Sequence, residues 1–186
     1  MTTKIKKIAT VQFGYYAQPA DNGTIPYLQA KHFGENGQNL NQIDCFIEDS
    51  PKVRENLLQG GDILFTSKGF RVFATMVDNT IGNAIASSLF YIIKVDITKV
   101  LPQYLVSVLN TQKNIQYFKQ LGAGSSIPSI RKNEVLDFSF NLVPMEEQHK
   151  IVALNQLFLK DIEISQNLIQ QKHILHNDTI SKLINQ

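Results

Sequence analysis

The residues from Pro144 to about Asn185 contain no glycine or proline after the first position. They begin with Pro144, followed by Glu146 and Glu147. Proline in the first helical position, with acids near the positive end of the helix dipole, is typical of a helix start. A helix of about 40 residues would be about 60 Å long, longer than a small domain is wide. We therefore predict a globular body followed by one long helix.

Apolar residues recur along this helix at a spacing of three or four, with interruptions at Asp161 and Gln171. A single helix cannot bury so broad a stripe against itself. It needs either its own domain or a second helix in a coiled coil. We favour the coiled coil and keep docking on the preceding domain as the alternative. The residues predicted to mediate dimerisation are Leu154, Leu157, Ile164, Leu168 and Leu175.

The chain has 186 residues, 43% hydrophobic and 18% charged, which suits one folded domain with an appendage. Its net charge of +2 is too small to name a partner by itself. The single cysteine, Cys45, excludes an internal disulfide and fits a reducing cytoplasm. The first seven residues lack the apolar run of a signal peptide, and no segment approaches the roughly 20 apolar residues of a membrane span. We expect a cytoplasmic protein without membrane contact.

Short apolar runs separated by turn residues predict an α/β or α+β fold for residues 1–143. We expect a single domain with a mixed, twisted sheet and few helices, followed by the long coiled-coil helix over 144–186. The predicted strands cover residues 25–30, 43–47, 63–66, 71–77, 84–95 and 138–143, and residues 4–11 form a strand or a helix. The strand over 84–95 is broken by Ser87-Ser88. Helices are predicted over 101–110 and 113–121, with short helical turns at 51–53 and 132–136.

The sequence offers little for catalysis. It has no G-x-x-x-x-G-K-[ST] phosphate loop, and Gly122-Ala123-Gly124 lacks the third glycine of a dinucleotide site. Cys45 is followed by apolar residues, which indicates a strand residue rather than a nucleophile. His173 and His176 could share a metal, but no third ligand accompanies them. We expect a non-enzymatic binding protein without a metal or cofactor.

Three polar loops carry cations at the ends of predicted strands. Lysine and arginine pair with phosphates or with guanine edges, and serine and threonine can do either. For one such loop alone, an ordinary solvated turn is the better interpretation. Three such loops on a basic domain favour binding of nucleic acid. The predicted DNA contacts are Gln29, Lys31 and His32 in the first loop, Thr66, Ser67, Lys68 and Arg71 in the second, and Ser125, Ser126 and Arg131 in the third.

The order of motifs resembles a known family. Gly61-Asp62-Ile63-Leu64-Phe65, followed by Lys68-Gly69, resembles the "GDIL…G" signature in target recognition domains of type I restriction–modification specificity subunits. Other segments resemble that family in the same order: Ile25-Pro26-Tyr27-Leu28, then Ser125-Ser126-Ile127-Pro128-Ser129-Ile130, and finally Pro144-Met145-Glu146-Glu147-Gln148 with Ile151. The resemblance covers nearly the whole chain.

This resemblance implies a function. A full specificity subunit has two target recognition domains and two long helices that pack antiparallel as a spacer. Each domain reads one half of a split DNA target, and the subunit docks modification subunits that carry the methyl-transfer chemistry. This chain has one such domain and one helix, so it resembles a half-subunit. We expect two copies to pair with two-fold symmetry and to read an inverted, interrupted palindrome.

Two other classes of function stay open. The chain could be an interaction or scaffold module whose helix binds a partner and whose loops touch no DNA. The recognition domain of an adenine methyltransferase is similar in fold, but this chain lacks the N/D-P-P-Y motif that holds the flipped base. Activity of the chain alone is therefore not expected.

Overall fold

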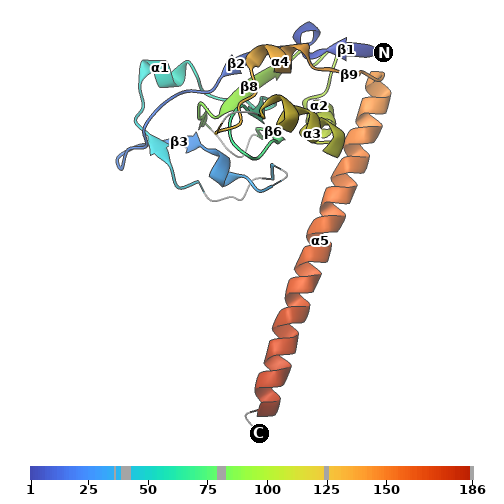
Figure 1. Ribbon diagram of the computed structural model, residues 1–186. Helices are drawn as coiled ribbons and strands as arrows, with labels where there is room; N and C mark the ends of the chain where they lie inside the picture. The colour runs from blue at the N-terminus through green and yellow to red at the C-terminus, as the bar shows by residue number, and fades with distance from the viewer. Residues whose placement is uncertain (36, 39–42, 79–82, 124–125, 185–186) are drawn as a thin grey trace. The chain divides into compact units, whose positions relative to one another are not determined.

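The computed structural model describes residues 1–35, 37–38, 43–78, 83–123 and 126–184 (Figure 1). The chain divides into two compact units, Met1–Gln148 and His149–Gln186. The first unit mixes short strands with helices, and the second is helical. The predicted α+β fold with a long C-terminal helix is confirmed.

The centre of the first unit is a four-stranded antiparallel sheet in the order β2-β8-β5-β6. Its strands are β2 (Ala9–Phe13), β8 (Phe90–Val95), β5 (Ile63–Thr66) and β6 (Ala74–Met76). Every residue of β5 is buried, as its continuous apolar run predicts. The predicted hairpin partner of β5 is present as β6.

Two smaller sheets complete the first unit. In one, β3 (Ile25–Leu28) pairs antiparallel with β4 (Phe46–Ile47) and parallel with β7 (Ile85–Ala86). In the other, β1 (Thr2–Lys4) pairs antiparallel with β9 (Ser139–Asn141). This last pairing joins the beginning and the end of the unit, which neighbouring residues in the sequence cannot reveal.

The strand predicted over residues 84–95 is two strands, β7 and β8, which belong to different sheets. The chain turns between them because the Phe90 N–H donates to the Ser87 carbonyl at 3.0 Å. The Ser87 N–H in turn donates to the Leu28 carbonyl at 2.8 Å. The serine pair therefore marks the point where the chain leaves one sheet and enters another.

The helices of the first unit are short. In α1 (Pro51–Arg54), the Ser50 hydroxyl accepts a hydrogen bond from the Val53 N–H at 3.3 Å, so the predicted cap is confirmed. The remaining elements are the 3-10 turns η1 (Ile5–Lys7) and η2 (Ala30–His32) and the helices α2 (Pro102–Leu109), α3 (Gln112–Leu121) and α4 (Lys132–Asp137).

Aromatic residues fill the core on both faces of the central sheet. Side chains of a strand alternate between the two faces, so Leu64 and Phe65 of β5 point in opposite directions. Leu64 packs in a cluster with Phe33, Phe73 and Phe90, whose rings lie 5.7–6.0 Å apart. Phe65 packs against Phe118 of α3 at 4.8 Å. A central strand covered on both faces explains why β5 is wholly apolar up to its last residue.

The turn before β5 explains the first part of the family signature. Gly61 has a φ of +93°, which favours glycine. Asp62 is buried, and its Oδ2 accepts from the Gln59 N–H at 3.0 Å and from Lys94 Nζ at 2.9 Å. The Gly-Asp pair is therefore a structural turn, as its position in the sequence predicts.

The second unit continues α5 (Met145–Ile184), a helix of 40 residues that runs without a break (Figure 1). From Ala153 to Ile184 every described residue is exposed. The predicted dimerisation residues are between 54% and 67% exposed: Leu154, Leu157, Ile164, Leu168 and Leu175. No described helix is long and apolar enough to span a bilayer.

Candidate nucleic-acid interface

The second predicted loop joins β5 to β6, and its first residues hold it in place. Thr66 and Ser67 are each only 2% exposed. Thr66 Oγ1 accepts from the Phe73 N–H at 3.1 Å, and the Ser67 N–H donates to the Leu89 carbonyl at 2.8 Å. These two predicted DNA contacts are therefore turned into the domain, where they shape the loop.

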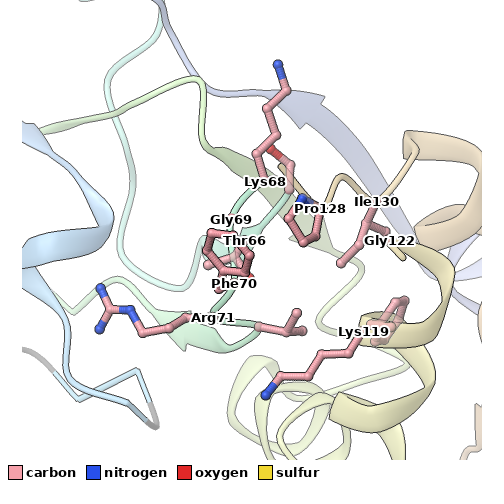
Figure 2. Close-up of a pocket in the computed structure, with 12 residues that line it drawn as sticks. Thr66, Lys68, Gly69, Phe70, Arg71, Lys119, Gly122, Pro128 and Ile130 are labelled. Atoms are coloured by element: carbon pink, nitrogen blue, oxygen red, sulfur yellow. The ribbon is translucent and has the colours of Figure 1, made fainter. Parts of the chain in front are cut away.

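The next residues of this loop meet the third predicted loop. Lys68 forms an isolated antiparallel bridge with Ser129, and the Gly69 N–H donates to the Pro128 carbonyl at 2.9 Å. Gly69 has a φ of +107°, a conformation that favours glycine. The Lys68 side chain is exposed. Two loops that are far apart in the sequence thus form one surface, from which Lys68 reaches into solvent (Figure 2).

Arg71 joins the second loop to the first. Its guanidinium donates to the carbonyls of Phe33 at 2.8 Å and Ala30 at 2.6 Å. The same group lies 5.7 Å from the centre of the Phe73 ring. Its side chain is 33% exposed. Arg71 therefore positions η2 against the loop, and its charge remains near the surface.

The first predicted loop is built around His32, which is 3% exposed. His32 Nδ1 accepts from the Gln29 N–H at 3.0 Å, and Nε2 lies 2.8 Å from Asp44 Oδ1. Lys31 Nζ lies 2.7 Å from the same carboxylate. Hydrogen bonds from Lys31 and then His32 hold the pKa of Asp44 well below its usual range, and Asp44 raises the pKa of Lys31. The buried His32 side chain thus stabilises this loop through its hydrogen bonds to Gln29 and Asp44.

Potential ligand atoms of His32, Asp44 and Cys45 lie within 4.8 Å of one another. Because His32 Nδ1 accepts from a backbone N–H, the ring proton belongs on Nε2, facing Asp44. The Cys45 thiol lies 3.8 Å from Gln29 Oε1. This arrangement satisfies its own donors and acceptors as a hydrogen-bonded cluster, and it leaves no imidazole lone pair directed at a metal. This cluster was not predicted, because His32 and Asp44 are far apart in the sequence.

The third predicted loop leads into α4. Ser125 lies outside the described residues. Ser126 and Arg131 are both exposed. The Arg131 N–H donates to Glu134 Oε2 at 2.6 Å, which caps the start of α4. The exposed members of the predicted set are therefore Lys31, Lys68, Ser126 and Arg131, with Gln29 partly exposed.

A cavity of about 170 Å³ opens where the second and third loops meet α3. Its wall includes Phe70, Lys119, Pro128 and Ile130 (Figure 2). Phe70 is 75% exposed and Lys119 is exposed as well. Neither residue is among the DNA contacts predicted from the sequence. Phe70 stood between two cations in the sequence, whereas nothing there linked Lys119 of α3 to this loop.

Solved structures share this fold. The S subunit of a type I restriction–modification system from M. genitalium matches with a TM-score of 0.60 and 15% identity, over 88% of this chain and 40% of that chain. The HsdS subunit from Thermoanaerobacter tengcongensis matches with a TM-score of 0.62 and 14% identity, over 88% of this chain and 38% of that one. The fold is thus the recognition-domain-and-helix class found in specificity subunits.

The chain belongs to the family of type I restriction modification DNA specificity domains, whose model matches residues 2–171. A curated relative, the type I restriction enzyme HindI specificity subunit of Haemophilus influenzae, is 28% identical over 130 residues. That match covers 67% of this chain and 28% of the relative, so the chain spans well under half of its relatives' length. The predicted family and the non-catalytic class of the chain are confirmed.

Proposed function

We propose that this chain binds a specific duplex DNA sequence and reads one half of a two-part target. The family match over residues 2–171 is the observation that carries this proposal. The exposed Lys68 and Arg131 support it, because both extend from loops that meet on one surface. Lysine and arginine on such loops neutralise phosphates or pair with guanine edges.

The proposed contact residues follow from exposure. Gln29, Lys31, Lys68, Ser126 and Arg131 contact DNA directly. The buried His32, Thr66 and Ser67 act by fixing the loops, and Arg71 does so through its two carbonyl partners. Ser125, which lies outside the described residues, stays a DNA contact predicted from the sequence.

The proposed active form is a homodimer. The exposed apolar stripe of α5 supports this, because Leu154, Leu157, Ile164, Leu168 and Leu175 remain in solvent in a single chain. Two copies related by a two-fold axis would present two identical recognition domains. The dimer would dock modification subunits in the cytoplasm.

Selection of bound duplexes from a random-sequence pool tests this function. We expect enrichment of two short inverted motifs separated by a gap of constant length. A pool without any enriched motif would contradict DNA recognition and favour a protein-interaction module. A single uninterrupted motif would contradict the dimer but retain DNA recognition. Copurification with coexpressed modification subunits tests the docking separately.

A further inference from the structure

Phe70 is a large apolar side chain on an exposed loop tip. Its ring is 75% exposed, in contrast with its sequence neighbours Val72 and Phe73, which are buried. Isolated exposed apolar residues are common on protein surfaces and carry no meaning by themselves. What distinguishes Phe70 is the construction of the loop around it.

The backbone on both sides of Phe70 is fixed. On one side, Gly69 donates to the Pro128 carbonyl at 2.9 Å, and Ser67 accepts from the Ile130 N–H at 2.9 Å. On the other side, the Phe73 N–H donates to Thr66 Oγ1 at 3.1 Å, and the Arg71 side chain is held by two carbonyls. An aromatic side chain on a clamped backbone loses little further entropy when it binds a partner.

Cations surround the Phe70 ring. Lys68 and Arg71 extend from the loop in different directions, and Lys119 extends from α3 toward the space below Phe70 in the view of Figure 2. Arg71 also forms an ion pair with Glu35 at 3.9 Å, whereas neither Lys68 nor Lys119 forms an ion pair among the described residues. An apolar tip within a positive rim complements a surface that is anionic at its edges and has an apolar group between them.

The DNA major groove has this character. Phosphates line its edges, and the thymine 5-methyl group is the apolar group that a base pair presents there. Phenylalanine has no donor or acceptor, so it can distinguish base pairs in the groove only through this methyl group. We propose that Phe70 reads an A·T pair by contact with the thymine methyl, while Lys68 and Lys119 reach the flanking phosphates. This inference rests on the proposed function.

The cavity beside Phe70 strengthens the contact. Its wall includes Phe118, Pro128 and Ile130 next to the Phe70 ring. A methyl group placed between the ring and this wall would be shielded from water on more than one side. The specificity of Phe70 therefore depends on the joined second and third loops.

The test replaces each thymine of the selected target, one at a time, with deoxyuridine, which lacks only the 5-methyl group. Binding of each duplex is measured for the wild type and for Phe70→Ala, Phe70→Leu and Tyr16→Ala. Tyr16 is the matched control, since it is an aromatic residue that is also 75% exposed. Thermal unfolding of each variant confirms that it is folded.

We expect the wild type to lose affinity about 3- to 10-fold at one uracil position in each half-site. Phe70→Ala should bind the thymine duplex more weakly by a similar factor and should no longer distinguish uracil there. Phe70→Leu should keep part of the discrimination, and Tyr16→Ala should keep all of it.

Specific binding by the wild type without any uracil-sensitive position would overturn the inference and leave the proposed function standing. The same holds if Phe70→Ala keeps the wild-type uracil profile, or if the half-site contains no A·T pair. Failure of the wild type to select any sequence would overturn both.

Discussion

Gln148 Oε1 accepts a hydrogen bond from the backbone N–H of Leu101 at 2.8 Å. Leu101 is the N-cap of α2, where no side chain of its own caps the helix. The amide nitrogen of Gln148 donates to the carbonyls of Lys99 at 3.1 Å and Val143 at 3.0 Å. Gln148 is 1% exposed, and its side chain satisfies three backbone groups at once. This accounts physically for glutamine at the end of the Pro144–Gln148 motif.

Replacing Gln148 with Glu should destabilise the first unit by about 1–3 kcal/mol, because the carboxylate would be buried at this position and cannot donate to the carbonyls of Lys99 and Val143. Urea unfolding followed by circular dichroism measures the change. His149→Glu is the control, since it introduces the same side chain at the next, exposed position of α5. Equal stability of the two variants would show that the Gln148 hydrogen bonds contribute nothing measurable.

Leu168→Asp should convert the proposed dimer into a monomer, because it places a charge within the apolar stripe of α5. Sedimentation equilibrium at tens of micromolar protein measures the change. Gln166→Asp adds the same charge at an exposed polar position of the same helix and should leave the dimer intact. A wild type that sediments as a monomer at these concentrations would refute pairing through α5.

Lys68→Gln should weaken binding to the selected DNA and reduce its dependence on salt. Loss of one phosphate contact lowers the slope of log K against log salt by about 1. Lys52→Gln, an exposed lysine of α1, removes the same charge and should have a smaller effect. If both variants lower affinity and slope equally, only the net charge matters and the loop is wrongly assigned.

Tyr27, Tyr91 and Tyr104 should ionise at higher pH in the folded protein than in the unfolded chain. Burial is the main cause that raises the pKa of the first three above the usual value of 10.0. In the unfolded chain they ionise near pH 10, so their contribution to stability is complete below that pH. It is lost as pH rises toward the folded-state values. The tyrosinate absorbance of the folded protein should therefore be incomplete at a pH where the denatured protein is fully ionised, and the melting temperature should fall above about pH 10. Identical titration curves of the folded and the denatured protein would contradict this.

Elements that depend on local pattern were predictable from the sequence. The 40-residue α5, the apolar β5 and the Ser50 cap follow from proline placement, continuous hydrophobicity and capping chemistry. The break at Ser87 was visible as polarity within an apolar run. The membership of β7 and β8 in different sheets was not, because strand pairing depends on distant residues.

The candidate site was predictable only in part. Side-chain chemistry selected Thr66, Ser67 and His32, but tertiary packing buries all three. Arg71 bonds to Ala30 and Phe33, about 40 positions earlier in the chain, so its positioning role had no local signal. Polarity alone does not tell a supporting residue from a contacting one. Phe70 shows the opposite case, because it is apolar and yet 75% exposed, which its residue type does not predict.

The central proposal is that two copies of this chain read one DNA target together. The most direct measurement compares affinity for duplexes that carry the selected half-site once, twice as an inverted repeat, or twice as a direct repeat, with the gap varied in single base pairs. We predict that one inverted spacing binds at least about 10-fold more tightly than the single half-site or any direct repeat. Equal affinity for a single half-site and for every paired arrangement would contradict the proposal that two copies read one target together.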